Sequence, residues 1–335
     1  ADTDIVYEKM GFVDASAGEK FIPTYWSQCA LLPNNDIIKI GGKDNNITDE
    51  VLNEVYRSSD GGNTWYQIST FPVSIHGMAV CVNQNGHIIV SGGTTDYSGY
   101  TNVRNNVWIS KDGGDNWSTQ TDDAEWDARR LHNMVCLPDN SIVLAGGLNS
   151  DKTFNDVWKS NDDGKTWTLI TSNAPWSGRY TQYSMFVHNW NIIITFTSSG
   201  IQDTWISKDG GYEWTLQSNI APSSIFALPQ ENNIIMTKNG ILYWVLYDDD
   251  KKVFKSVDYG KNWTLVADIT GQLEYSYVQN SVCIEWKNSL IIAGGYADGY
   301  SRNEVFRSDD EGRSWYELTA NAGNIFGTNV NSIPS

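Results

Sequence analysis

Short apolar stretches alternate with polar turns along the chain. The segment from Trp126 to Ile170 shows the order most clearly. In it, "RRLHNMVCL" is β-rich and alternates, "NSIVLAGG" is apolar up to a Gly-Gly pair, and "VWKS" and "WTLIT" flank the polar turn "NDDGKT". Stretches of this length between Gly, Asn and Asp residues are typical of antiparallel strands. We therefore expect four strands here, A to D, joined in chain order.

One octapeptide marks the turn between strands C and D. Its six copies read SSDGGNTW, SKDGGDNW, SNDDGKTW, SKDGGYEW, SVDYGKNW and SDDEGRSW. The closing tryptophans, 47 to 52 residues apart, are Trp65, Trp117, Trp167, Trp214, Trp263 and Trp315. A β-rich repeat of about 50 residues is typical of a β-propeller. We predict an all-β, six-bladed β-propeller with four antiparallel strands per blade and the octapeptide in each C–D turn.

The prediction treats residues 1–335 as a single β-propeller domain. Its blades are expected to span about 24–70, 71–123, 124–173, 174–219, 220–270 and 271–320. The stretches outside these repeats, "DIVYEKMGFV" near the start and "NIFGTNVNSIPS" at the end, are expected to take part in ring closure. Which terminus closes the ring stays open.

Charge and hydropathy narrow the classes of partner. The chain has 335 residues and a net charge of −17. This charge opposes approach to nucleic acid phosphates and to anionic lipid surfaces. The chain also lacks an apolar run of about 18 residues, the length that spans a bilayer. We expect no nucleic acid partner and no membrane insertion.

Four cysteines occupy the same slot in four repeats, within "SQCALL", "MAVCVN", "NMVCLP" and "NSVCIE". Equivalent slots of a repeat array are usually too far apart for a disulfide. We therefore expect Cys29, Cys81, Cys136 and Cys283 to be buried free thiols that fill core positions.

The octapeptide resembles the Asp-box, or BNR, repeat Ser-x-Asp-x-Gly-x-x-Trp, and all six copies match its four positions. The order of a Gly-Gly pair followed by "NDVW" along the repeat is similar to that of kelch repeats. Families with such boxes include sialidases, xyloglucan hydrolases, sorting receptors and lectin-like or assembly proteins. The resemblance to the kelch/Asp-box, sialidase-like superfamily implies a propeller and does not decide its function.

The chemistry of the box favours a structural role. Its Ser and Asp side chains can accept hydrogen bonds from N–H groups of the turn, its Gly permits a positive φ, and its Trp packs into the blade. Six identical copies suit this role, because a catalytic site needs different residues in one place. The structural aspartates are Asp60, Asp112, Asp162, Asp209, Asp258 and Asp310.

The opposite face, made by the B–C and D–A connections, is more varied and is expected to carry the function. Five of the eight arginines map to it. The candidate ligand-binding residues are Trp126, Arg129, Arg130, His132, Trp176, Arg179, Tyr180, Arg104 and Arg302. Two interpretations stay open: the repeated Trp-x-x-Arg spacing either packs neighbouring blades together or lines a polar, aromatic pocket for a ligand.

Glycoside hydrolases are the alternative on that face. The resemblance to sialidases implies three arginines and a Phe-Arg-Ile-Pro signature, but the nearest stretch, "KFIP", has Phe21 where the arginine belongs. A two-carboxylate hydrolase needs an acid and a base about 5 to 9.5 Å apart. Its candidates are Glu125, Asp127, Asp96 and Asp298. The four histidines lack metal-ligand spacing, so we expect no metal and no cofactor, and no catalytic residue is assigned.

The sequence thus favours a non-catalytic, extracellular or secreted protein that binds a glycan or a protein partner through its B–C and D–A connections. A glycoside hydrolase acting from the same face and a structural subunit of a surface assembly are the alternatives. Whether the chain catalyses a reaction, its oligomeric state and glycosylation of the sequon at Asn46 stay open.

Overall fold

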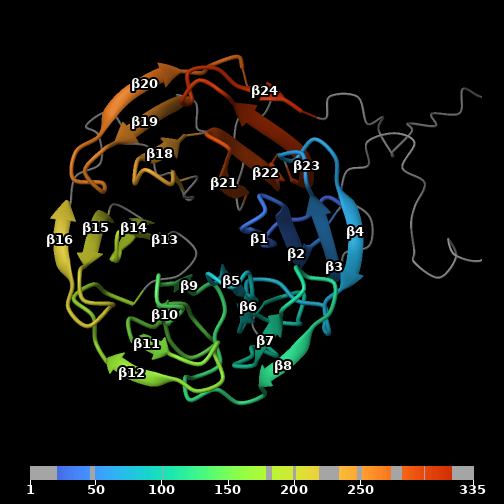
Figure 1. The fold of residues 1–335 in the computed structure, drawn as a ribbon, viewed down its shortest axis with the longest axis vertical. Coiled ribbons are helices and arrows are strands. Elements are labelled where there is room, and N and C mark those ends of the chain that lie inside the picture. Colours follow the sequence, from blue (N-terminus) through green and yellow to red (C-terminus); the bar gives the residue numbers. More distant parts are fainter. Residues whose placement is uncertain are drawn as a thin grey trace, which may run out of the picture.

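The computed structural model describes residues 21–45, 50–99, 101–178, 183–198, 201–218, 234–246, 251–272, 281–297 and 299–318. In these residues all regular secondary structure is β, and six four-stranded sheets stand around a central axis (Figure 1). Neighbouring strands within each sheet pair antiparallel. The predicted all-β, six-bladed propeller with four antiparallel strands per blade is therefore confirmed.

Each blade uses four consecutive strands, from strand A at the centre of the ring to strand D at its rim. In chain order, four to a blade, they are β1 (Gln28–Leu31), β2 (Ile37–Lys43), β3 (Val51–Ser58) and β4 (Tyr66–Thr70); β5 (Ala79–Val82), β6 (Ile88–Ser91), β7 (Val107–Ser110) and β8 (Ser118–Thr121); β9 (Asn133–Cys136), β10 (Ile142–Ala145), β11 (Val157–Ser160) and β12 (Thr168–Thr171); β13 (Tyr183–His188), β14 (Asn191–Ser198), β15 (Ile201–Ser207) and β16 (Thr215–Ser218); β17 (Ile234–Met236), β18 (Leu242–Val245), β19 (Lys252–Ser256) and β20 (Thr264–Asp268); β21 (Val282–Trp286), β22 (Ser289–Ala297), β23 (Tyr300–Ser308) and β24 (Tyr316–Glu317).

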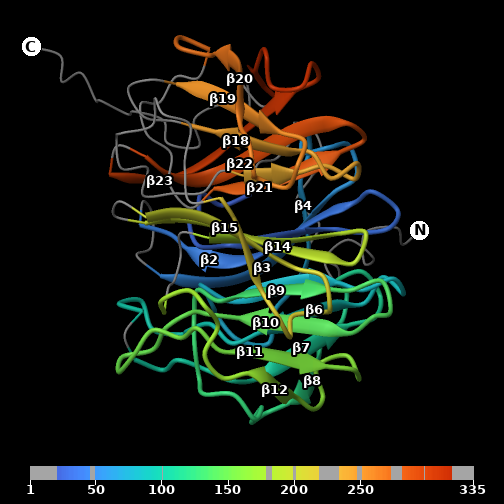
Figure 2. The ribbon, with the colours of Figure 1, turned by 90° about the vertical axis from the view of Figure 1, so that its left-hand side faces the viewer.

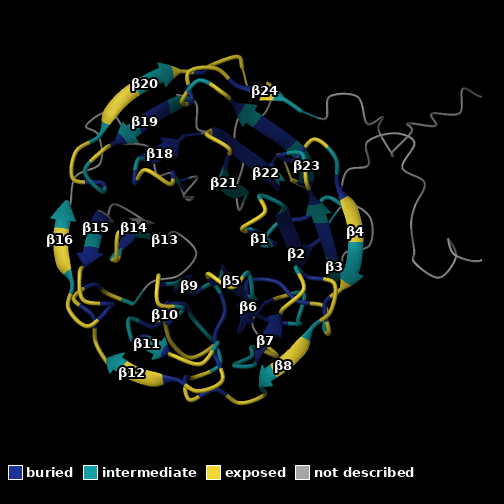
Figure 3. Cartoon of the chain, in the orientation of Figure 1, coloured by how far each residue is buried: buried dark blue, intermediate teal, exposed yellow. Residues whose placement is uncertain are grey.

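Burial explains the apolar pattern of the strands. Strand B is buried along its whole length in β2, β6, β10 and β18, whereas strand D begins with exposed residues in β4, β8, β12 and β20 (Figure 3). Both faces of a blade are covered by its neighbours, so a middle strand is apolar on both sides, as "IIV" is in β6. Hydrophobic clusters of the described residues fill all six joints between neighbouring blades.

The strand order sorts the turns onto two faces. The strands cross the disc from one face to the other (Figure 2), so A–B and C–D turns share one face and B–C and D–A connections share the other. Strand C of blade 1 ends at Ser58 and strand D begins at Tyr66, which places the first octapeptide in the C–D turn. We call the face of the octapeptides the box face and the opposite face the loop face.

The segment just before β1 joins blade 1 to blade 6. The Thr24 N–H donates to the main-chain oxygen of Arg302 (3.3 Å), and the Gly295 N–H donates to that of Thr24 (3.3 Å). The Phe21 side chain fills the hydrophobic cluster between the two blades. In the described residues both blades keep their own four strands, so packing and loop hydrogen bonds close the ring there.

Candidate functional site

Each Asp-box is a hydrogen-bonded turn on the box face. In the first, the Ser58 hydroxyl donates to Asp60 Oδ1 (2.9 Å) and accepts from the Gly62 N–H (2.8 Å). Asp60 Oδ1 also accepts from the Thr64 N–H (2.8 Å), and the Trp65 indole donates to the Gly62 carbonyl (3.0 Å). The serine and aspartate contacts recur in all six boxes.

These hydrogen bonds favour the ionised form of five box aspartates. Burial opposes ionisation, but the hydrogen bonds donated within the turn outweigh it and lower the carboxyl pKa. The lowered pKa is found for Asp60, Asp112, Asp162, Asp258 and Asp310. A carboxylate whose oxygens already accept several hydrogen bonds is a poor proton donor or acceptor for a substrate.

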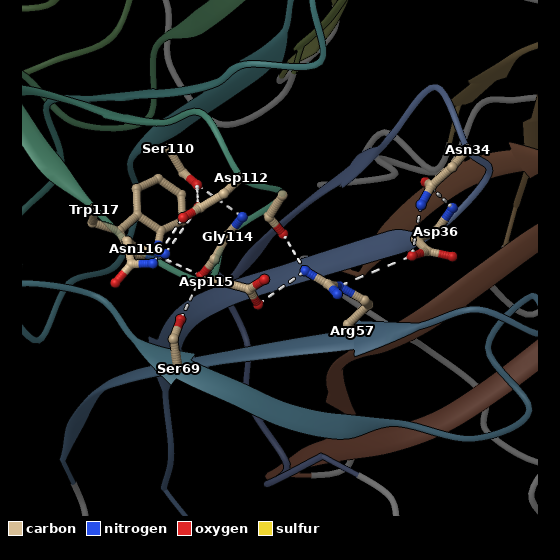
Figure 4. A network of polar contacts seen from close by, with 11 residues as sticks. Asn34, Asp36, Arg57, Ser69, Ser110, Asp112, Gly114, Asp115, Asn116 and Trp117 are labelled. Atoms are coloured by element: carbon tan, nitrogen blue, oxygen red, sulfur yellow. Dashed lines mark hydrogen bonds and ion pairs between the residues drawn. The ribbon is translucent and has the colours of Figure 1, made fainter. Parts of the chain in front are cut away.

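The boxes also contact the preceding blade (Figure 4). Arg57, at the end of β3, donates to the carbonyl of Gly113 (2.9 Å) and pairs with Asp115 (3.1 Å), both in the box of blade 2. The Ser69 hydroxyl of β4 donates to the next carbonyl, that of Gly114 (2.5 Å). The box is therefore both a turn and an interblade joint.

Arg129, a predicted ligand-binding residue, is fully buried. Its Nη1 and Nη2 bind the Asp156 carboxylate at 2.6 and 2.9 Å, and Nη1 also donates to the Gly146 carbonyl (2.9 Å). Its Cζ lies 3.9 Å from the centre of the Phe154 ring. These contacts match the packing interpretation of the Trp-x-x-Arg spacing.

Trp126 and Trp176 belong to a set of four aromatic residues that plug the joints between blades. Each is buried, and its ring meets the box tryptophan of the following blade edge-on, with 4.8 to 6.1 Å between ring centroids. The pairs are Phe21 with Trp65, Phe71 with Trp117, Trp126 with Trp167, and Trp176 with Trp214. An asparagine in or just before strand C of the preceding blade donates to the carbonyl of each plug; these are Asn303, Asn53, Asn105 and Asn155.

Arg130 and His132 are also buried, at 5 % and 3 % exposure. His132 Nε2 lies 2.9 Å from Ser91 Oγ. Burial and the Arg129 charge lower the pKa of His132 far below its usual value, so the ring is a neutral core residue. Arg130 lies on the loop face, with Cζ 5.8 Å from the centre of the Trp26 ring.

The other predicted residues are spread over the loop face. Arg104 and Arg302 are half-buried, and their carbonyls accept from the N–H groups of Arg129 (3.0 Å) and Thr24 (3.3 Å). Arg179 and Tyr180 lie outside the described residues. The structure therefore brings Trp126, Arg129, Arg130 and His132 to the joint between blades 2 and 3, and Trp176 to the next joint.

Aromatic side chains surround Lys43 on the loop face. Its ammonium lies 3.9, 5.1 and 5.4 Å from the ring centres of Tyr97, Trp26 and Tyr25, and it donates to the Tyr97 carbonyl. Tyr25 also contacts Tyr296 of blade 6, with ring centroids 5.1 Å apart. Lys43 is only 5 % exposed, whereas the four rings are half-buried. These five residues and Arg130, the only one of them predicted as a ligand contact, form what we call the aromatic cluster.

Trp26 takes an unusual backbone conformation at the edge of this cluster. Its φ is 55°, in the left-handed region, and the residues at its position in the next two blades are Gly77 (65°) and Leu131 (56°). A bulky side chain there costs about 1 to 2 kcal/mol. The Trp26 ring stacks on His76, at 5.3 Å and 15°. Aligning "TYWS", "IHGM" and "RRLH" across the three blades was the sequence signal that could have found this residue.

Three of the four hydrolase candidates have another partner in the structure. Glu125 Oε2 accepts from the Trp167 N–H (2.9 Å), Asp127 pairs with Lys152 (2.9 Å), and Asp96 accepts from the Thr101 N–H (3.2 Å). Asp298 lies outside the described residues. Every carboxyl group with a shifted pKa in the described ranges is shifted downward, whereas a general acid needs an upward shift.

The described part of the chain contains neither a metal centre nor a helix that could span a membrane. No group of three or more His, Cys, Asp or Glu side chains there is arranged to hold a metal ion. No helix in those residues is long and apolar enough to cross a bilayer.

Comparisons with known proteins agree on the fold. A family model described as "Sortilin, neurotensin receptor 3", of the Asp-box-type propeller family Sortilin-Vps10, matches residues 53–182, less than half of the chain. No curated protein matches the chain. A solved structure titled "Structure of YjhT" is 13 % identical, covers 90 % of this chain and 99 % of its own, and has a TM-score of 0.65. At this identity the likeness shows the fold alone.

Proposed function

We propose that this protein is a non-catalytic binding propeller that holds a glycan or a protein partner on its loop face. The aromatic cluster carries the proposal, because three half-buried rings of blades 1 and 2 lie around one buried cation and the half-buried Tyr296 of blade 6 contacts one of these rings. Aromatic faces stack on the C–H surfaces of sugars and are enriched where proteins bind partners. The propeller acts as the rigid frame that holds these rings.

The buried cations influence which ligand fits the cluster. Lys43 and Arg130 are each 5 % exposed, and Arg129 is fully buried against Asp156. These charges hold rings and carbonyls in place and have little contact with solvent. A neutral sugar face or an uncharged peptide segment therefore fits the cluster better than an acidic group does.

The class and location of the protein are part of the proposal. Six complete Asp-boxes, the kelch-like Gly-Gly phase and the partial match to a sorting-receptor family support membership of the kelch/Asp-box, sialidase-like superfamily. Glycans and receptor partners are displayed mainly outside the cell, so this function favours an extracellular or secreted location. A glycoside hydrolase that acts from the same face is the alternative, and it differs by releasing sugar.

A glycan array that contains neutral and acidic sugars tests the proposal. The test variant is Trp26→Gly with Tyr97→Ala, because glycine is the residue at the corresponding position of blade 2, Gly77. The control is Tyr212→Ala, which removes a 53 % exposed aromatic side chain from the box face. We expect the wild type and the control to bind a neutral glycan, and the double variant to bind it at least about tenfold more weakly.

The outcomes separate the candidate functions. Equal loss of binding in the control, or unchanged binding in a double variant that still melts cooperatively, would overturn the loop-face site. Release of free sugar during the incubation would favour the hydrolase. If the wild type binds no glycan, the glycan ligand is ruled out and the same variants are tested against peptides.

A further inference from the structure

Two of the four cysteines meet in one joint of the propeller. Cys81 lies in β5 and Cys136 in β9, the neighbouring inner strands of blades 2 and 3 (Figure 1). Cys81 is 7 % exposed and belongs to the hydrophobic cluster between these blades, and Cys136 packs against the same cluster. Both side chains therefore face the same joint, where the Cys136 thiol helps to raise the pKa of Cys81. Both are free thiols, so the joint contains an adjacent dithiol.

The other two cysteines show why this pairing is specific. Cys29 and Cys283 also lie on neighbouring inner strands, β1 and β21. Cys29 packs into the joint between blades 6 and 1, whereas Cys283 packs into the joint between blades 5 and 6. Ile284, the residue after Cys283, packs into the joint that holds Cys29, because successive side chains of a strand point to opposite faces. Cys29 and Cys283 are therefore separated by the sheet of blade 6.

The surroundings of the pair indicate which thiol reacts first. Burial raises the pKa of the Cys81 thiol well above its usual value, and the Cys136 thiol and the Asp163 charge add to the rise. Cys136 is half-buried and the more accessible of the two. Since the thiolate is the nucleophile in disulfide exchange, an external disulfide is expected to react at Cys136.

We propose that Cys81 and Cys136 are a redox site, closing to a reversible disulfide that staples blade 2 to blade 3. A low-molecular-weight disulfide such as oxidised glutathione is the oxidant. The Cys136 thiolate attacks one of its sulfurs and releases one glutathione thiolate. Cys81 then loses its proton and attacks the Cys136 sulfur, which releases the second glutathione thiolate. Two protein thiols are oxidised, one glutathione disulfide is reduced, and two protons are released.

Thiol counting on the native protein tests this site. The folded chain is incubated with oxidised glutathione, and its remaining thiols are alkylated in denaturant and counted by mass spectrometry. We expect two thiols to be lost, one cross-linked peptide containing Cys81 and Cys136, and full recovery after reduction with dithiothreitol. The variant Cys29→Ser with Cys283→Ser is the matched control and should form the same cross-link.

Single variants identify the order of attack. In Cys81→Ser we expect Cys136 to accumulate as a glutathione mixed disulfide, and in Cys136→Ser we expect Cys81 to stay reduced. The stapled wild type should melt a few degrees higher than the reduced form, because the staple closes a long loop in the unfolded chain. Four free thiols after oxidation, glutathionylation without a cross-link, or a Cys29–Cys283 cross-link would overturn the proposal.

Discussion

The two faces of the propeller differ in how strictly they repeat. On the box face, six turns use the same serine and aspartate hydrogen bonds. On the loop face, the residue after the second glycine of the Gly-Gly pair is different in each of four blades: Lys43, Thr94, Leu148 and Tyr296. A contact that is needed in every blade must be the same in every blade, whereas a ligand site must differ from its surroundings. A ligand site is therefore expected where the blades differ from one another.

The loop face itself has two layers. Its inner layer repeats, because an aromatic plug and an asparagine in or just before strand C recur in four joints. Its outer layer does not repeat, because the rings around Lys43 come from blades 1 and 2, and Tyr296 of blade 6 contacts one of them. Arg129 belongs to the inner layer and the aromatic cluster to the outer one. Variants that affect one layer at a time can test this division.

Removal of Arg129 should have the largest effect. Arg129→Ala leaves the Asp156 carboxylate without its partner in a mostly buried place, so the free energy of unfolding should fall by about 3 to 5 kcal/mol. Arg104→Ala on the same face is the control, since its side chain makes one long contact, 3.5 Å to Asn106, and the loss should be under about 1 kcal/mol. Guanidinium denaturation measures the free energy of unfolding of both variants. Equal losses would contradict the division into layers.

A methyl group in a box tests the interblade joint. In Gly164→Ala the new Cβ would lie 2.8 Å from Val107 of the preceding blade at a φ of 84°, and we expect a loss of about 3 kcal/mol. Gly271→Ala on the loop face has nearly the same φ, 82°, and no atom within 4 Å of the Cβ, so it isolates the backbone cost of about 1 kcal/mol. Melting temperatures show which of the two variants loses more stability. If both variants lose the same stability, the box does not pack against its neighbour.

The charge of a box aspartate should have the smallest effect. Burial opposes ionisation of Asp258, but the bonds from Asn262 and Ser256 outweigh it and lower its pKa in the folded state. Its charge therefore contributes stability above the unfolded pKa of about 4, and this contribution is lost as the pH falls through the folded pKa. Asp258→Asn should lose about 1 kcal/mol at neutral pH, and the difference from wild type should shrink below about pH 4. Urea denaturation at several pH values measures it, and a difference that does not change with pH would contradict the role of the charge.

The repeats were readable from the sequence because their signals are local. Each Asp-box lies within eight residues, and each strand is short and bounded by turn residues. The plugs were not recognised as one set, because Phe21 and Phe71 stand in two repeats where Trp126 and Trp176 stand in the others. The Trp-x-x-Arg spacing was therefore interpreted as a feature of two repeats, although the position of its tryptophan holds a phenylalanine in two others.

The centre of the aromatic cluster, Trp26 and Lys43, was missed for a different reason. Trp26, Lys43, Tyr97 and Tyr296 come from three blades and meet only across joints, so no local pattern connects them. The dithiol depends on register as well, since Cys81 pairs with Ile89 and Cys136 with Ile142, the second and first residues of their B strands. Equivalent slots in the sequence therefore need not be equivalent in space.

The central claim is that the loop face binds a ligand and the box face maintains the fold. Amide hydrogen exchange of the wild-type protein, with and without a glycan selected on the array, tests it most directly. We predict slower exchange at residues 25–27, 43–45 and 94–99 when the glycan is bound, and unchanged exchange in the six octapeptides. Protection of the octapeptides without any change around the aromatic cluster would contradict the claim.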